Sequence, residues 1–388
     1  MKNLHFLIKP ASSACNLRCK YCFYTDIAEN RSVKHMGMMQ RDTVQNLLNA
    51  AFSTIEPNGN IHFAFQGGEP TLVGLPFFKD FVEAVEKTKS GKVSVSYSMQ
   101  TNGTRLDDDW VSFLKENDFL VGVSLDGYKD LHNFYRVNTE GNGSWGIVNQ
   151  AFQKLVRGGV RTNILCVVTA QCAKHPAKAY NEFKKMGGKH MQFIPCIDPI
   201  EENRGKASFS LTPHAYGEFL CKLFDLWYDD WTKGCYHSIR LFEDYVNILL
   251  GHLDGTTCAT CGQCGSYLVV EGDGSVYPCD FFVLDRWRMG KLGEHTLKDM
   301  LGSQQAKAFI QWGSNKPEEC KSCRWRSLCN GGCKNDWERS APPKNYFCES
   351  FKTFFTYAET RLCMIAKKEL QARRLYHGSL REKDRKIL

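Results

Sequence analysis

Residues 13–24 read Ser-Ala-Cys-Asn-Leu-Arg-Cys-Lys-Tyr-Cys-Phe-Tyr, and this stretch follows directly on the first strand-like run of the chain. Its three thiols, Cys15, Cys19 and Cys22, lie on one tight loop. A structural zinc site closes with four ligands, whereas an iron–sulfur cluster held by three cysteines keeps one iron open to a substrate or cofactor. A zinc site would need a fourth ligand, and the nearest candidate, His35, stands 13 residues beyond Cys22. The loop therefore favours an iron–sulfur cluster with an open iron.

The chain has 18 cysteines in 388 residues, and their clumping indicates metal ligation. Three lie in the first 22 residues, nine lie between residues 258 and 348, and six are scattered, at positions 166, 172, 196, 221, 235 and 363. The start, MKNLHFLIKP, lacks the charged and long apolar segments of a secretory signal. We therefore expect a cytoplasmic protein, in which thiols stay reduced and disulfides are rare.

Composition and charge narrow the class of protein. A content of 43% hydrophobic and 24% charged residues is typical of a globular protein, and no window reaches the roughly 18 apolar residues of a membrane span. Of the net charge of +8, +5 lies in Lys367–Leu388, which has eight Lys or Arg against three Asp or Glu. A solvated tail is the ordinary reason for such a run, and partner binding is the alternative. We expect no membrane and no nucleic acid as partner.

The first 200 residues alternate between short apolar runs and helical patterns. Continuous apolar runs suit parallel strands that are buried on both faces, so this alternation predicts a β/α barrel or an open parallel sheet. The expected strands are Phe6–Ile8, Ile61–Phe65, Val93–Met99, Leu120–Leu125, Asn163–Val168 and Met191–Ile194. The expected helices are Thr43–Phe52, Phe77–Lys87, Asp107–Lys115, Ile147–Leu155 and Ala177–Met186.

The pattern changes after Ile200. Two amphipathic helices are expected over Tyr216–Trp231 and Arg240–Leu250, and the segment Gly272-Asp273-Gly274-Ser275 predicts a β-hairpin. We place a boundary between residues 235 and 257. The expected domains are residues 1–235, residues 236–365 as a small α+β domain, and a basic tail over residues 366–388.

Polar segments follow the ends of successive predicted strands, where the active sites of barrels lie. They are Gly67-Gly68-Glu69-Pro70, Gln100-Thr101-Asn102-Gly103 and Ser124-Leu125-Asp126-Gly127, with Arg136 and Ile197 further on. With the C-x3-C-x2-C spacing of the loop, this series resembles the radical S-adenosylmethionine (SAM) enzymes. The resemblance implies a partial (β/α)6 TIM-like barrel and a cluster held by Cys15, Cys19 and Cys22. It also implies SAM contacts from Tyr21, Gly67, Gly68, Glu69, Ser124, Arg136 and Ile197.

The second group of cysteines resembles the SPASM extension of these enzymes, in which two auxiliary clusters cross over. The resemblance implies two sets of four ligands and thus three 4Fe–4S clusters in all. The first set is Cys258, Cys264, Cys279 and Cys333, and the second is Cys320, Cys323, Cys329 and Cys348. Two zinc ribbons fit the spacing nearly as well, and Cys261 could replace Cys258 or Cys264.

The whole pattern, with the segments Leu7–Ser13, Phe65–Pro70 and Val276–Phe281, is similar to the anaerobic sulfatase-maturating enzymes. This resemblance implies oxidation of a sulfatase Cys or Ser to Cα-formylglycine (3-oxoalanine) by a 5′-deoxyadenosyl radical that takes a Cβ hydrogen, with Asp280 as the base. It implies as partners a sulfatase segment of the form Cys/Ser-x-Pro/Ala-x-Arg and an electron donor such as flavodoxin or ferredoxin. We expect a monomer.

Two other functions stay open at this point. A SPASM maturase that cross-links a ribosomally made peptide would use the same clusters, although Asp280 and the pair Phe65-Gln66 favour sulfatase maturation. A non-catalytic metalloprotein that binds nucleic acid through its tail is the alternative from another class. The sequence leaves open the choice of Cys or Ser, the sulfatase and the reductase. It also leaves open the residues that read the substrate, although Tyr24 and Gln66 lie where they could.

The ligand count leads to a first prediction. Anaerobically reconstituted protein should contain about twelve iron and twelve sulfide atoms per chain, because three cubanes hold four of each. Metal and acid-labile sulfide analysis checks this. Stoichiometric zinc, or only four irons, would contradict the assignment of the second group of cysteines.

Overall fold

The computed structural model describes residues 1–89, 91–200, 204–253, 257–262, 264–265, 267–337 and 344–385, with side chains up to residue 373. Residues 386–388 of the expected basic tail lie outside the described residues. Two compact units are present: Met1–Leu211 with Gln263–Asn315, and Thr212–Gly262 with Lys316–Leu388. Each unit combines two separate segments of the chain that pack together. The expected domain boundary at residue 235 stays a prediction.

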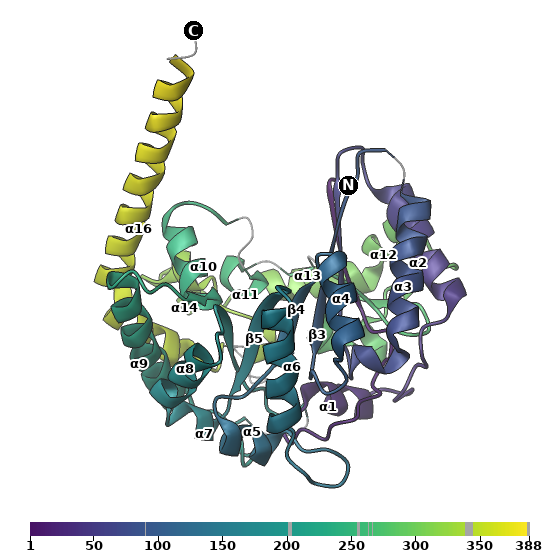
Figure 1. Cartoon of the computed structure of the whole chain (residues 1–388), viewed down its shortest axis with the longest axis horizontal. Coiled ribbons are helices and arrows are strands. Elements are labelled where there is room, and N and C mark those ends of the chain that lie inside the picture. The colour runs from purple at the N-terminus through teal and green to yellow at the C-terminus, as the bar shows by residue number, and fades with distance from the viewer. Residues whose placement is uncertain are drawn as a thin grey trace. The chain divides into compact units, whose positions relative to one another are not determined.

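Parallel strands alternate with helices through the first unit, which confirms the predicted α/β class (Figure 1). The parallel strands pair in chain order: β1 (Asn3–Ile8), β2 (Asn60–Phe65), β3 (Ser94–Thr101), β4 (Leu120–Ser124), β5 (Arg161–Val168) and β6 (His190–Pro195). The larger helices are α2 (Arg41–Thr54), α3 (Leu75–Thr88), α4 (Asp108–Glu116), α6 (Trp145–Arg157) and α8 (Pro176–Lys185). Short elements at strand ends are α1 (Phe23–Glu29), η1 (Pro70–Val73), α5 (Lys129–Tyr135) and α7 (Ala170–Ala173).

The predicted hairpin is present and extends the barrel sheet. Strand β8 (Leu268–Val270) pairs antiparallel with β9 (Ser275–Tyr277), and β9 pairs antiparallel with β10 (Gly290–Lys291). Strand β8 also pairs parallel with β1, with Phe6 opposite Leu268. Within this unit the strand order is β10-β9-β8-β1-β2-β3-β4-β5-β6. Four short elements complete the segment: η2 (Asp280–Phe282), η3 (Asp285–Trp287), α12 (Leu297–Leu301) and α13 (Gln304–Ser314).

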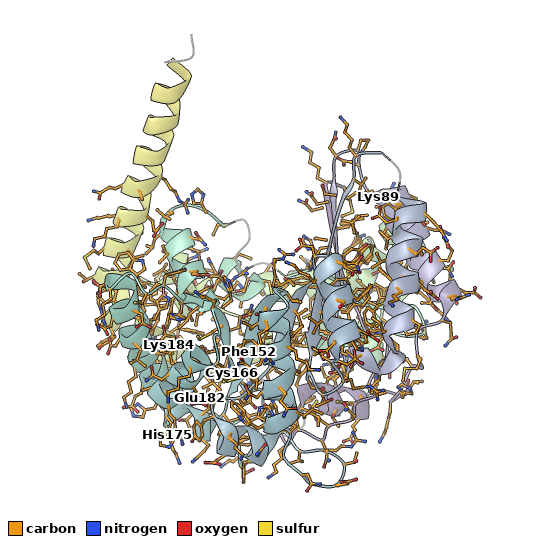
Figure 2. All side chains as sticks on the ribbon, viewed as in Figure 1. Lys89, Phe152, Cys166, His175, Glu182 and Lys184 are labelled. Atoms are coloured by element: carbon orange, nitrogen blue, oxygen red, sulfur yellow. The ribbon has the colours of Figure 1, made fainter. Side chains whose placement is uncertain are left out.

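Burial alternates along the strands, and this alternation separates a core face from a site face. Phe63 and Phe65 of β2 are buried, and their rings meet Phe81 of α3 at centroid distances of 5.2 and 5.1 Å. Phe152 of α6 and Cys166 of β5, labelled in Figure 2, are also buried, and α6 packs on β5. His62 and Ala64, on either side of Phe63, are less buried and face the other way. The helices therefore cover one face of the sheet, and the opposite face is free to line a site.

Helices dominate the second unit. They are α9 (Pro213–Thr232), α10 (Arg240–Leu249), α11 (Cys258–Cys261), α14 (Glu318–Lys321), α15 (Arg326–Cys329) and α16 (Cys348–Arg385), with β7 (Ser238–Ile239) and η4 (Lys334–Asp336) between them. Helices α9 and α10 confirm the two predicted amphipathic helices. Phe354 of α16 is fully buried, and its ring centroid lies 5.6 Å from that of Phe224 and 5.5 Å from that of Phe242. Among the described helices, none is long and apolar enough to cross a bilayer.

A core substitution tests this packing. Phe63→Ala should lower the free energy of unfolding by about 3–5 kcal/mol, because it removes a buried ring and leaves a cavity. Ile147→Ala, at a side chain that is 50% exposed, should change it by less than about 0.5 kcal/mol. Chemical denaturation of the full chain, followed by circular dichroism, measures both. An equal effect of the two variants would contradict the assignment of Phe63 to the core.

Candidate active site

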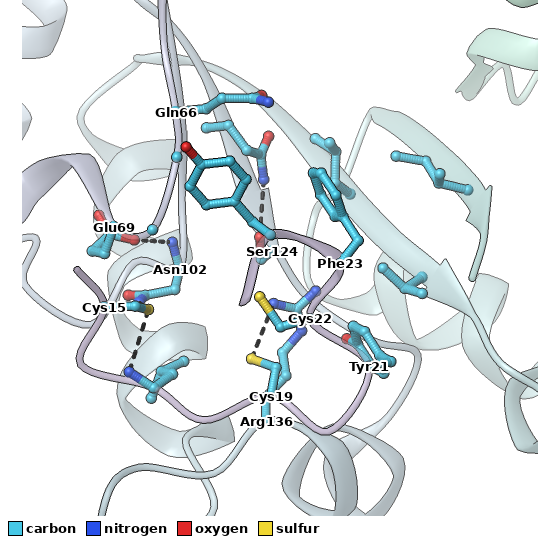
Figure 3. A pocket seen from close by; sticks show the side chains of 18 of the residues that line it. Cys15, Cys19, Tyr21, Cys22, Phe23, Gln66, Glu69, Asn102, Ser124 and Arg136 are labelled. Carbon is cyan, nitrogen blue, oxygen red and sulfur yellow. Dashed lines mark hydrogen bonds between the residues drawn. The ribbon is translucent and has the colours of Figure 1, made fainter. Parts of the chain in front are cut away.

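A cavity of about 290 Å³ opens at the carboxyl ends of the parallel strands. The three cysteines of the N-terminal loop line it, and Gln66 lies across the cavity from Cys19 (Figure 3). The remaining predicted SAM contacts and Asp280 also line it: Tyr21, Gly67, Gly68, Glu69, Ser124, Arg136 and Ile197. The structure thus brings together every residue that the sequence assigned to this site, although they come from six segments of the chain.

Backbone bonds hold the cysteine loop against the end of α5. Arg18 N donates to Val137 O at 2.7 Å, and Lys20 N donates to Tyr135 O at 3.0 Å. Burial raises the pKa of the Cys15 thiol to about 11 and that of the Cys19 thiol to about 12. Burial alone disfavours the thiolate form, whereas a coordinated metal stabilises thiolates and keeps the cysteines deprotonated. The loop therefore fits a metal centre.

A single metal ion fits the loop less well than a cluster does. Among the described residues, no three Cys, His, Asp or Glu side chains converge closely enough to hold one ion. A 4Fe–4S cluster is larger than an ion and binds each cysteine through a different iron. This spacing disfavours the zinc alternative for the loop.

The Gly-Gly-Glu segment packs directly on the cysteine loop. Gly68 N donates to Ser12 O and Glu69 N donates to Ala14 O, both at 2.8 Å. A Cβ atom on Gly68 would lie 2.0 Å from Ala14 O, so only glycine allows this approach. The close backbone contact fixes the segment beside the three thiols.

Both oxygens of the Glu69 carboxyl group accept hydrogen bonds from the protein. The group accepts hydrogen bonds from Thr71 Oγ1 at 2.6 Å, Thr101 Oγ1 at 2.7 Å and Asn102 N at 2.7 Å, and the side chain is 1% exposed. Burial raises its pKa. Asn102 Nδ2 lies 3.8 Å from Cys15 Sγ, so Asn102 contacts both Glu69 and the cysteine loop (Figure 3). The segment Gln100–Gly103, to which the sequence assigned no role, therefore positions both Glu69 and Cys15.

Arg136 is held beside the cluster loop by an acid that sequence reasoning did not single out. Its Nε donates to Asp126 Oδ2 at 2.9 Å, and the Tyr21 hydroxyl donates to the same oxygen. Nη1 of Arg136 lies 4.0 Å from Cys19 Sγ (Figure 3). The carboxylate of Asp126 raises the pKa of the guanidinium even though burial opposes this. A fixed cation therefore stands at the cavity wall, where it could bind a carboxylate.

Asp280 faces the cavity from the first turn after the hairpin. Gln66 Nε2 donates to Oδ2 of Asp280, and the Lys9 ammonium pairs with Oδ1. Phe281, the next residue, packs edge-on against Phe23 at a centroid distance of 5.2 Å. Sequence reasoning named Gln66 but missed Lys9. The signal that could have found it is a lysine inside the apolar start Leu7-Ile8-Lys9-Pro10, where a charge needs a partner.

A second cavity, of about 50 Å³, lies in the second unit. The four cysteines predicted to hold one auxiliary cluster all line it: Cys320, Cys323, Cys329 and Cys348. Burial raises the pKa of Cys329 to about 11 and also raises that of Cys348. The donor set fits a closed cluster. The other predicted set has Cys264 and Cys279 in the first unit and Cys258 and Cys333 in the second, and it stays a prediction, as does the place of Cys261.

The chain is similar to known proteins over most of its length. A model of the radical SAM superfamily matches residues 10–176, and one of an iron–sulfur cluster-binding domain, SPASM, matches residues 258–324. The chain is 45% identical over 370 residues to a cysteine-type anaerobic sulfatase-maturating enzyme of Clostridium novyi, covering 95% of this chain and 98% of that one. A serine-type enzyme of Bacteroides thetaiotaomicron is 32% identical, covering 95% and 92%.

Solved structures give the same result. The structure of anSMEcpe with bound AdoMet and the Cp18Cys peptide has a TM-score of 0.89 and 43% identity, covering 94% of this chain and 99% of that one. Streptococcus suis SuiB bound to its precursor peptide SuiA has a TM-score of 0.60 and 15% identity, covering 86% and 72%. The second similarity extends to the fold alone.

The glycine contact gives a test of the site. Gly68→Ala should weaken SAM binding by at least about tenfold, or about 1.4 kcal/mol, because the new methyl group pushes the segment away from the loop. Gly146→Ala adds a methyl group to a helix where nothing lies within 4 Å, and it should leave SAM binding unchanged. Equilibrium binding to reconstituted protein measures both, with iron content as a check on assembly. Wild-type affinity in Gly68→Ala would contradict the close approach.

Proposed function

The chain belongs to the anaerobic sulfatase-maturating enzymes of the radical SAM superfamily, and on that premise we propose that it oxidises a cysteine of a sulfatase to Cα-formylglycine. One observation carries the proposal: the three loop thiols, the Gly-Gly-Glu segment and Asp280 line a single cavity. The choice of cysteine over serine follows the relatives, since those named cysteine-type are 44–45% identical to this chain and those named serine-type are 30–32% identical.

In the proposed site, the chain binds and orients SAM. When bound, a reduced iron–sulfur cluster and SAM supply a 5′-deoxyadenosyl radical that abstracts a hydrogen atom from the substrate. The backbone of Gly67 and Gly68 binds the amino group, and Arg136 with Ser124 binds the carboxylate. Ile197, next to the apolar wall residues Ile194 and Val167, packs on the adenine. Tyr21 acts through Asp126, because its hydroxyl donates to that carboxylate.

Asp280 is the proposed base. A cysteine that becomes a thioaldehyde loses a hydrogen atom from Cβ, a proton from sulfur and one electron. The hydrogen atom goes to the radical and the proton goes to Asp280. An auxiliary iron–sulfur cluster, which the second group of cysteines would hold, would accept the electron. Hydrolysis of the thioaldehyde then gives the aldehyde and hydrogen sulfide. Gln66 and Tyr24 line the cavity beside Asp280, where they can contact the substrate side chain.

The partners follow from this chemistry. The substrate is a sulfatase segment of the form Cys-x-Pro-x-Arg or Cys-x-Ala-x-Arg, and a flavodoxin or ferredoxin supplies electrons. We propose that the protein works as a cytoplasmic monomer. The alternative, cross-linking of a ribosomally made peptide, draws on the likeness to SuiB, which is a likeness of fold.

Substrate choice is testable with two peptides. With SAM and a reductant under anaerobic conditions, the protein should convert a Cys-x-Pro-x-Arg peptide into a hydrazine-reactive aldehyde at least about tenfold faster than its serine counterpart, a difference of about 1.4 kcal/mol in activation free energy. Mass spectrometry and hydrazone formation measure the product. Formation of 5′-deoxyadenosine without an aldehyde from either peptide would contradict the proposal.

The base is testable by substitution. Asp280→Asn should keep SAM cleavage but lower formylglycine formation by about 10²–10⁴-fold, which is the usual contribution of a general base. Liquid chromatography of 5′-deoxyadenosine and mass spectrometry of the peptide measure the two products in one reaction. Unchanged formylglycine formation would leave Asp280 as a structural residue only.

A further inference from the structure

We propose that Lys9 is a positioning residue for the reaction: its ammonium holds one oxygen of the Asp280 carboxylate, so that the other oxygen is presented to the substrate. This inference rests on the proposed function, because it takes Asp280 as the base. It adds a residue that does not line the cavity and lies far from Asp280 in the sequence, directly after β1.

Lys9 is buried in a way that requires a specific partner. The residue follows β1 and is 0% exposed. Its backbone is fixed, since Lys9 N donates to Val270 O at 2.8 Å and Lys9 O accepts from Ser12 N at 3.0 Å. A buried ammonium is costly unless it is paired, and Asp280 Oδ1 supplies the pairing carboxylate. The fixed backbone and the burial of Lys9 therefore keep its ammonium paired with Asp280.

The two oxygens of Asp280 have different environments. Oδ1 pairs with Lys9, whereas Oδ2 accepts a hydrogen bond from Gln66 Nε2. Asp280 and Gln66 line the cavity, and Lys9 is not among its lining residues. Oδ2 is thus the oxygen on the side of the substrate. Because Lys9 does not reach the cavity, it acts on the reaction through Asp280.

A second buried ion pair holds Lys9 in place. The ammonium lies 3.6 Å from the centroid of the Tyr24 ring, whose hydroxyl donates to Glu271 Oε1. Arg31 Nη1 pairs with the same oxygen at 2.9 Å, and the side chains of Arg31 and Glu271 are both 0% exposed. Tyr24 is therefore anchored at its hydroxyl end, and its ring face stays against the ammonium. Negative and positive side chains therefore alternate in the order Asp280, Lys9, Glu271 and Arg31, with the Tyr24 ring between Lys9 and Glu271.

Orientation of the carboxylate matters because proton transfer needs a hydrogen-bond distance and a correct angle at the accepting oxygen. Asp280 begins the short helix η2, where the backbone alone does not fix the side chain. Loss of the Lys9 charge would let the carboxylate rotate away from the substrate. Hydrogen abstraction, which uses other residues, would continue without productive oxidation.

The experiment compares two variants that each remove the cation of one ion pair, inside and outside this network. Lys9→Met leaves Asp280 without its cation, and Arg361→Met leaves Asp225, in the second unit, without its cation. The measured quantity is formylglycine formed per 5′-deoxyadenosine in the reconstituted full-length protein. Lys9→Met should lower this ratio by at least about tenfold, while Arg361→Met should keep it within about twofold of the wild type, because only Lys9 touches the base. A purely structural role would lower both products together.

A double variant shows whether Lys9 acts through Asp280. Lys9→Met combined with Asp280→Asn should give the same ratio as Asp280→Asn alone, because groups that act as a unit are not additive. If Lys9→Met fails to retain its clusters, Lys9→Gln, which keeps a donor without the charge, is measured with the same expectation.

The outcomes separate this inference from the function on which it rests. A wild-type ratio in Lys9→Met, an equal fall in Arg361→Met, or additive effects in the double variant would overturn the role of Lys9 and leave the proposed function standing. Absence of formylglycine from the wild-type reaction would overturn the function itself. A wild-type ratio in Asp280→Asn would remove the base and with it the role of Lys9.

Discussion

The buried carboxylate of Glu69 is the group on which the rest of the active site depends. It accepts hydrogen bonds from the ends of two elements, η1 and β3, and its own amide donates to the cysteine loop. A carboxyl group inside a protein is costly unless its oxygens are hydrogen-bonded, and here the protein itself supplies the hydrogen bonds. These hydrogen bonds form only when η1, the end of β3 and the cysteine loop have this arrangement. Burial of Glu69 therefore favours this one arrangement over others.

The opposite side of the cavity depends on charge alternation. The pairs Lys9–Asp280 and Arg31–Glu271 place two cations against two anions, with Tyr24 between the pairs, and Asp280 and Tyr24 line the cavity. These residues come from the end of β1, from α1 and the segment after it, and from the hairpin segment. Strand β8 pairs with β1, so the hairpin that carries Glu271 and Asp280 is part of the same sheet as the loop. The proposed base and the cysteine loop thus adjoin strands of one sheet.

Much of the fold could be predicted from local pattern. Continuous apolar runs predicted the parallel strands, and the Gly-Asp-Gly-Ser segment predicted the hairpin, because both signals depend on neighbours in the chain. The pairing of β8 with β1 could not be predicted, since Phe6 and Leu268 meet only through tertiary packing. For the same reason Asp126 and Lys9 were missed: each acts on a partner, Arg136 or Asp280, that their local sequence does not specify.

The sequence by itself determined which groups are available for chemistry: the spacing of Cys15, Cys19 and Cys22, the Gly-Gly-Glu segment, and the alternation of strands and helices that predicts a parallel sheet. Residue type and spacing suffice for this, because they fix which groups a loop can present. Only the tertiary structure decided how the groups are held, with Asn102 on Cys15, Asp126 on Arg136 and Lys9 on Asp280. The physical reason is burial, since a charged or polar side chain that loses water must find its partner in space, wherever that partner lies in the chain.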